Sequence, residues 1–170
     1  MQLMPKPAPG FDDPLGLLRA CHERILGHCD TLERLVLHLR QHGADRDAQQ
    51  AAARILRYFQ VGVPLHHEDE ERDLFPALCA HSDFPAIQRL LLENLVAQHR
   101  ELDKLWMQLE ATLQVISRGA PADLPVQTFV ALTRAHILVE EREIFPLAGR
   151  YLDAATLADL SRAMQARRQT

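Results

Sequence analysis

Two long segments of this sequence carry an apolar residue at every third or fourth position, and this spacing constrains the fold more than any other feature. Such a stripe lies on one side of a helix and must be buried against other helices. Each stripe is interrupted by a single histidine. The first stripe consists of Leu15, Leu18, His22, Ile25, Cys29, Leu32, Val36 and Leu39, and the other of Leu92, Leu95, His99, Leu102, Trp106, Leu109, Leu113 and Ile116. The pattern predicts an all-α fold.

The turn and cap residues divide the chain into four long helices. We expect these helices over residues 14–42, 46–81, about 84–117 and 124–149, with Asp13-Pro14 as the first start signal. Their lengths and short connections favour an antiparallel up-down four-helix bundle over residues 14–151. An extended N-terminal arm, residues 1–13, and a short C-terminal fifth helix with its tail, residues 152–170, would complete the chain. Pro64 falls inside the second helix and should bend it.

Composition excludes several classes of protein. The net charge of −4 and the pI near 6.1 argue against nucleic-acid binding. We interpret the Arg167–Arg168 pair as part of a solvated tail. The apolar stretches are far shorter than the roughly 18–20 residues of a membrane span, and we recognise no signal peptide. The three cysteines form no CxxC pair, so we expect a cytoplasmic protein.

An eleven-residue motif occurs twice. Residues 66–76 read HHEDEERDLFP and residues 136–146 read HILVEEREIFP, with six of the eleven positions identical. In the first copy both His66/Glu70 and His67/Glu71 have the four-residue spacing that places two side chains on one helical face. In the second copy only His136/Glu140 has it, because position 137 is Ile. The register common to both copies is therefore His66/Glu70, and His67, Glu68, Asp69 and Glu71 are predicted on the outer face or behind the ligands.

The inward faces of the four helices thus hold four imidazoles and two carboxylates. An ionised carboxylate in an apolar core costs many kcal/mol unless it is compensated. Two divalent cations would compensate this set, because neutral imidazoles donate lone pairs and the carboxylates offset positive charge. The predicted metal ligands are His22, His66, Glu70, His99, His136 and Glu140.

The ligand chemistry favours two iron ions, a non-haem di-iron centre, with manganese or zinc as substitutes. Six side chains cannot saturate two octahedral ions, so positions would remain for a small diatomic ligand. The ferritin-like Glu-x-x-His motif is absent, since Arg19, Val63, Val96 and Thr133 precede the four histidines by three residues. The zincin motif His-Glu-x-x-His is absent as well.

The chain contains, in this order, a lone His, a His-x-x-x-Glu pair, a second lone His, and a second His-x-x-x-Glu pair followed by Phe-Pro. This order resembles the hemerythrin-like family, the HHE cation-binding domain. The resemblance covers roughly residues 12–150 and is closer to bacterial members than to invertebrate oxygen carriers. It implies a di-iron site in which His22, His66, His99 and His136 bind metal while Glu70 and Glu140 bridge. Asp103 stands one turn after His99 and is an additional candidate ligand, or a partner for a ring N–H.

The resemblance implies binding of oxygen or a related small oxidant for sensing, storage or scavenging, with dioxygen or nitric oxide as the small partner. The alternatives are iron handling, iron-centre repair, detoxification of peroxide or nitric oxide, and a structural metal-binding bundle. The cysteine-bearing domain of many repair proteins is missing from the sequence. No general acid or base stands out, so an enzymatic role stays open, and nothing in the sequence excludes a homo-oligomer.

Overall fold

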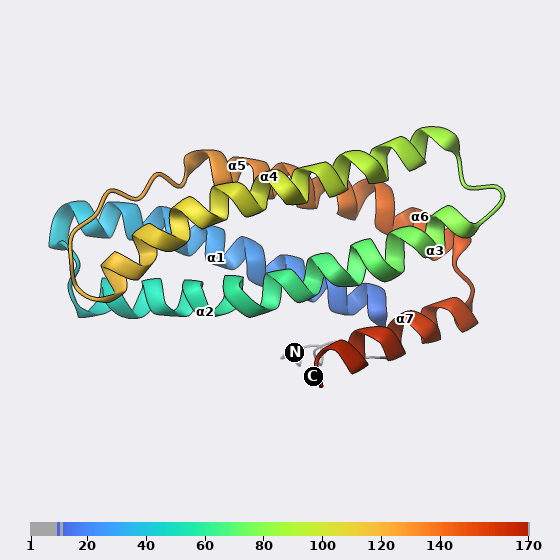
Figure 1. Cartoon of the computed structure of the whole chain (residues 1–170), viewed down its shortest axis with the longest axis horizontal. Helices are drawn as coiled ribbons and strands as arrows, with labels where there is room; N and C mark the ends of the chain where they lie inside the picture. Colours follow the sequence, from blue (N-terminus) through green and yellow to red (C-terminus); the bar gives the residue numbers. More distant parts are fainter. Residues whose placement is uncertain (1–9, 11, 170) are drawn as a thin grey trace, which may run out of the picture.

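The computed structural model describes residue 10 and residues 12–169, and within this part the regular secondary structure is all helical, with loops between the helices (Figure 1). The predicted all-α class is therefore confirmed. Most of the predicted N-terminal arm, residues 1–9 and 11, lies outside the described residues. The helical elements are α1 (Pro14–His42), α2 (Arg46–Glu68), η1 (Asp69–Leu74), α3 (Phe75–Ala80), α4 (Ala86–Ser117), α5 (Gln127–Val139), η2 (Glu140–Ile144), α6 (Phe145–Tyr151) and α7 (Ala154–Arg167).

Four helical segments lie side by side along the long axis of the molecule (Figure 1). They are α1, α2 continued by η1 and α3, α4, and α5 continued by η2 and α6. Helix α1 packs against α2 and α5, and α4 packs against the same two helices. The short helix α7 packs against η1 and α1. No helix among residues 12–169 is long and apolar enough to cross a membrane.

Helices α1, α2 and α7 start at side-chain caps. Asp13 accepts a hydrogen bond from the Gly16 N–H at 2.9 Å, with Pro14 at the first helical position, as predicted. Asp45 caps α2 and Asp153 caps α7 in the same way, through the N–H groups of Ala48 and Thr156. The starts of α4 and α5 are later than predicted, at Ala86 and Gln127. Prolines 85 and 125 explain the delay, because each favours extended backbone in the residue before it.

The second and fourth segments each contain a π-helical turn, η1 and η2, where the sequence predicts regular α-helix. The Phe75 N–H donates to the Glu70 carbonyl, and the Phe145 N–H donates to the Glu140 carbonyl, five residues back in both copies. A proline follows each phenylalanine, and proline lacks an N–H and clashes with the carbonyl four residues back. The wider turn accommodates the proline without ending the helix. Such insertions occur frequently at functional sites.

The buried apolar residues form two separate clusters rather than one. One cluster contains Ile25, Phe59, Leu102 and Val130, and the other contains Leu18, Leu74, Leu95 and Ile144. His22 stands between Leu18 and Ile25 in the chain, and His99 between Leu95 and Leu102. The predicted metal ligands therefore occupy a buried polar layer that divides the core.

Candidate metal centre

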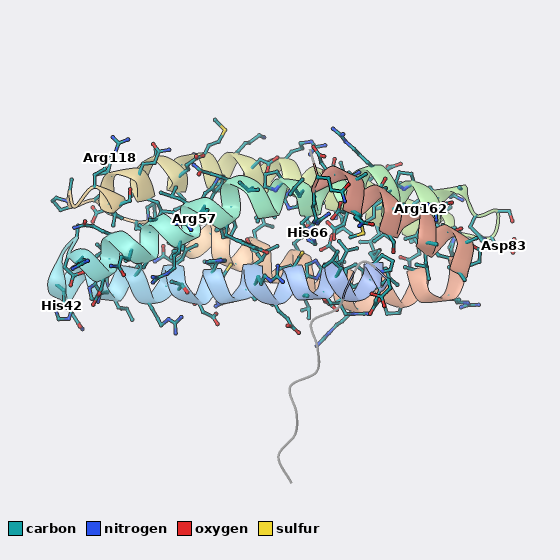
Figure 2. The ribbon with its side chains drawn as sticks, turned by 90° about the horizontal axis from the view of Figure 1, so that it is seen from below. His42, Arg57, His66, Asp83, Arg118 and Arg162 are labelled. Carbon is teal, nitrogen blue, oxygen red and sulfur yellow. The ribbon has the colours of Figure 1, made fainter. Side chains whose placement is uncertain are left out.

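All six side chains predicted as metal ligands lie in this polar layer and are at most 2% exposed. They come from four segments that are distant in sequence. His22 is on α1, His66 and Glu70 are on α2 and η1, His99 is on α4, and His136 and Glu140 are on α5 and η2. Figure 2 shows His66 in the interior, among the helices. The one-turn spacing of His66/Glu70 and His136/Glu140 brings each pair to the same point of the core.

The six residues form two overlapping groups that share both carboxylates. One group is His22, His66, Glu70 and Glu140, and the other is His99, His136, Glu70 and Glu140. Within each group the candidate ligand atoms all lie within 4.8 Å of one another. Two histidines with two shared carboxylates on each side are a suitable donor set for two divalent cations bridged by carboxylates.

The distances between imidazole and carboxylate atoms are short throughout the centre. His22 Nε2 lies 3.2 Å from a Glu140 oxygen and 3.6 Å from a Glu70 oxygen. His66 Nε2 lies 3.4 Å from Glu70, and His136 Nε2 lies 3.1 Å from Glu140. All these Nε2 atoms face the carboxylates, so their lone pairs can converge on a cation held between the helices.

Three of the four imidazoles have a fixed orientation because their Nδ1 atoms have partners. His22 Nδ1 lies 2.8 Å from Glu141 Oε1, and His99 Nδ1 lies 2.8 Å from Glu71 Oε1. His136 Nδ1 lies 2.9 Å from Gln98 Oε1. An Nδ1–H that donates to an oxygen leaves Nε2 as the acceptor or metal-binding atom. These partners therefore prepare Nε2 of each ring for a cation.

Several buried polar atoms of the centre have no hydrogen-bond partner within the described residues. They are His22 Nε2, His66 Nδ1 and all four carboxylate oxygens of Glu70 and Glu140. In addition, the Nε2 atoms of His99 and His136 lie 2.9 Å apart, with both Nδ1 atoms already engaged. Two lone pairs at that distance repel unless a proton or a cation lies between them. The donor set therefore fits bound metal.

The electrostatics of the centre lead to the same conclusion. Burial raises the pKa of Glu70 well above its usual range, and the neighbouring Glu140 raises it further. Burial alone would lower the pKa of His22, but the carboxylates of Glu140 and Glu70 raise it to about 10. Burial also lowers the pKa of His66 and of His99. Without cations the centre thus holds a charged His22 ring, neutral His66 and His99 rings, and a Glu70 carboxyl group that resists ionisation. Bound cations would stabilise the ionised form of that carboxyl group.

Three further residues near the site, Glu71, Asp103 and His67, lie outside the two His/Glu groups. Glu71 lies behind His99, as predicted for the outer positions of the motif. Asp103 belongs to neither group; its side chain is 57% exposed and its Oδ1 lies 4.0 Å from His67 Nδ1. His67 stacks on His99, with ring centroids 3.9 Å apart.

The sequence analysis does not identify two residues that orient ligand rings, Glu141 and Gln98, and it misinterprets the Arg167–Arg168 pair. The repeated Glu-Glu pair was a signal that could have identified Glu141, whereas Gln98 has no distinguishing pattern. The interpretation of Arg167–Arg168 as a solvated tail is wrong. Both arginines bind Asp69, a buried carboxylate that offsets the cost of partly burying their charges.

Comparisons with known proteins agree with this site. The family model of the hemerythrin HHE cation binding domain matches residues 13–148. An uncharacterized protein of Haemophilus influenzae is 31% identical over 173 residues, which cover 99% of this chain and 98% of the relative. The His/Glu clusters are compatible with the cation binding for which the family is described. This chain belongs to the hemerythrin HHE cation-binding domain family.

Proposed function

We propose that this protein is a non-haem di-iron protein that binds dioxygen, or a related small molecule such as nitric oxide, for sensing, storage or scavenging. The observation that carries the proposal is the pair of buried His/Glu groups that share Glu70 and Glu140. In this proposal the four long segments form an antiparallel up-down four-helix bundle. His22 and His66 would hold one iron and His99 and His136 the other, with Glu70 and Glu140 available to both.

The mixed nitrogen and oxygen donors favour iron, with manganese or zinc as substitutes. Bound iron would supply open coordination positions and reversible one-electron redox chemistry. The protein's own contribution is to hold the donors in place. Glu141, Glu71 and Gln98 fix three imidazole rings, so the donor atoms are oriented before a cation arrives.

A cavity of about 290 Å³ reaches the centre from one side and supports binding of a small molecule. Its wall includes the candidate ligands His66 and His136 and the aromatic rings of Phe59, Trp106 and Phe129. These rings make much of the wall apolar, which favours an uncharged occupant, while Gln60, Asp103 and Glu110 add polar groups to it. The Thr133 hydroxyl also lines the cavity, but it already donates to the Phe129 carbonyl at 2.8 Å. The Thr133 hydroxyl proton is therefore already engaged and is not offered to an occupant of the cavity.

The test begins with anaerobic loading of the protein with ferrous iron, followed by measurement of the iron-to-protein ratio. We expect about two irons per chain, and new charge-transfer absorption when dioxygen is admitted. A Glu140→Ala variant should lose both properties. Glu143→Ala is the matched control, because Glu143 is an exposed acid on the same turn. A ratio well below two, or a spectrum that dioxygen leaves unchanged, would contradict the proposal.

A further inference from the structure

Asp69 precedes the candidate ligand Glu70 and is held by two arginines from the far end of the chain. Its carboxylate is fully buried. Arg168 donates to it twice, from Nη2 to Oδ2 at 2.6 Å and from Nη1 to Oδ1 at 3.2 Å, and Arg167 also donates to Oδ1. Charge-assisted bonds of this kind are among the strongest in proteins, and losing one partner leaves a buried charge uncompensated.

Arg167 extends these contacts along the whole π-helical segment η1. Its Nη2 donates to Asp73 Oδ2 at 2.8 Å, and its Nε lies 3.2 Å from Glu68 Oε2. Glu68 stands just before η1 and Asp73 near its end. The Arg167 guanidinium therefore connects both ends of the turn that carries Glu70 to helix α7, and Arg168 adds its contact with Asp69.

The two copies of the motif differ at these positions. Residues 138 and 139 of the second copy are Leu and Val, where the first copy has Glu68 and Asp69. Glu70 and Glu140, the candidate bridging ligands, are identical in the two copies. The additional acids of the first copy therefore serve the contact with α7 rather than the donor set.

Helix α7 also has an apolar anchor on the same region. Leu160 and Met164 are at most 4% exposed and pack in the apolar cluster that contains Leu18 and Leu74, the last residue of η1. Figure 2 shows α7, where Arg162 is labelled, running along the outside of the long helices close to the His66 region. The buried apolar face holds α7 in place, and the position of α7 brings Arg167 and Arg168 within hydrogen-bond distance of Asp69.

We propose that Asp69, Arg167 and Arg168 are positioning residues that hold η1 in the conformation in which Glu70 faces both histidine pairs. The inference rests on the proposed function in so far as Glu70 is a metal ligand. A π turn departs from regular helical hydrogen bonding, so its geometry depends on surrounding contacts. Helix α7 supplies those contacts for the first copy, and the position of Glu70 is thereby coupled to the docking of the C-terminal helix.

Hydrogen exchange of the full-length protein tests the coupling without depending on metal. In an Arg167→Gln/Arg168→Gln variant, the amides of residues 69–75 should exchange about tenfold faster than in the wild type. Those of residues 140–145 should change far less and provide an internal control. Arg162→Gln is the matched control on α7, because Arg162 is exposed and pairs with Asp159 on the same helix. Wild-type exchange over residues 69–75 in the double variant would overturn the proposal.

A second measurement separates positioning from general stability. In iron-loaded protein at equal iron content, the double variant should show an altered absorption spectrum and faster loss of iron to a chelator. An Arg167→Gln/Arg168→Lys variant keeps the charge at position 168, so residues 69–75 should be better protected from exchange in it than in the double glutamine variant. If the double variant does not fold, Asp69→Val, which copies Val139, takes its place with the same expected exchange. Failure of the wild type to bind iron would refute the proposed function, while the exchange data would still decide the role of α7.

Discussion

The Nδ1 atom of His22 lies 2.8 Å from Oε1 of Glu141, so a carboxylate of the second motif orients the lone histidine of the first helix. The reciprocal contact joins His99 to Glu71 at the same distance, from the second half of the chain to the first. Arginines bind both glutamates: Arg19 Nε lies 3.2 Å from Glu141, and Arg100 Nη1 lies 2.9 Å from Glu71. Each half of the chain thus supplies the carboxylate that orients a histidine of the other half.

This reciprocity predicts the effect of removing Glu141. Glu141→Ala should weaken iron binding by roughly 10–100-fold, because the His22 ring loses the acceptor that fixes its orientation. Competition with a chromogenic chelator measures the change. Glu71→Ala should behave similarly through His99. Glu143→Ala, two residues further on and exposed, should bind iron like the wild type; equal weakening by Glu143→Ala and Glu141→Ala would contradict the orienting role.

Glu70 belongs to both His/Glu groups, whereas His22 belongs to one. Glu70→Ala should therefore abolish binding of both irons, and His22→Ala should leave about one iron per chain. The wild type should gain about 2.7 kcal/mol of unfolding free energy for each bound iron at free metal one hundred times the Kd of its site, and Glu70→Ala should gain none. Thermal unfolding under anaerobic conditions, with and without ferrous iron, measures the gain in stability of each protein, and the iron-to-protein ratio measures the number of irons bound. Retention of two irons in Glu70→Ala would refute the assignment of Glu70 as a shared ligand.

Val63 lines the 290 Å³ cavity one turn before His66. Val63→Trp should fill much of this space and slow the association of dioxygen or nitric oxide with the iron-loaded protein by about tenfold or more. Stopped-flow absorption measures the rate. Val61→Trp is the matched control, since Val61 on the same helix is 59% exposed. Unchanged rates in Val63→Trp, at wild-type iron content, would show that the ligand arrives by another route.

Asp45 caps α2 and contributes stability that depends on pH. The hydrogen bond from the Ala48 N–H, and that from His38, lower the pKa of Asp45 below its ordinary value of 3.8. Because the folded-state pKa is the lower one, the stabilisation is complete above about pH 3.8 and is lost as the pH falls through the folded-state value. Asp45→Ala should lower the Tm at pH 6, and the difference from the wild type should shrink near pH 3.

Asp45→Asn separates the charge of this cap from its hydrogen bond. Asparagine accepts the same backbone hydrogen bond without titrating, so its Tm difference from Asp45→Ala should vary little with pH. A wild-type advantage over Asp45→Ala that stays constant down to pH 3 would show that the carboxylate charge plays no part.

Local patterns predict the helices and the composition of the candidate site well. The helices of residues 14–42 and 154–167 begin and end at signals that lie within a few residues, such as the Asp13 and Asp153 caps. The spacing of His66 and Glu70 is a property of one helical turn, so the repeat alone selects this pair over His67 and Glu71. The sequence does not predict the π turns at Asp69–Leu74 and Glu140–Ile144, because only 6 and 7 helical residues follow them, too few to reveal a shift in the apolar period.

The all-helical class and the six residues that meet in the core can be predicted from the sequence, because both depend on contacts repeated every three or four residues. The groups that support these six residues depend on tertiary packing. Glu141 is 119 residues from His22, and Arg168 is 99 residues from Asp69. Such partners are brought together by the packing of whole helices, and no periodicity relates them in the chain. The six candidate ligands can therefore be identified in the sequence, whereas the interactions that orient them appear only in the folded molecule.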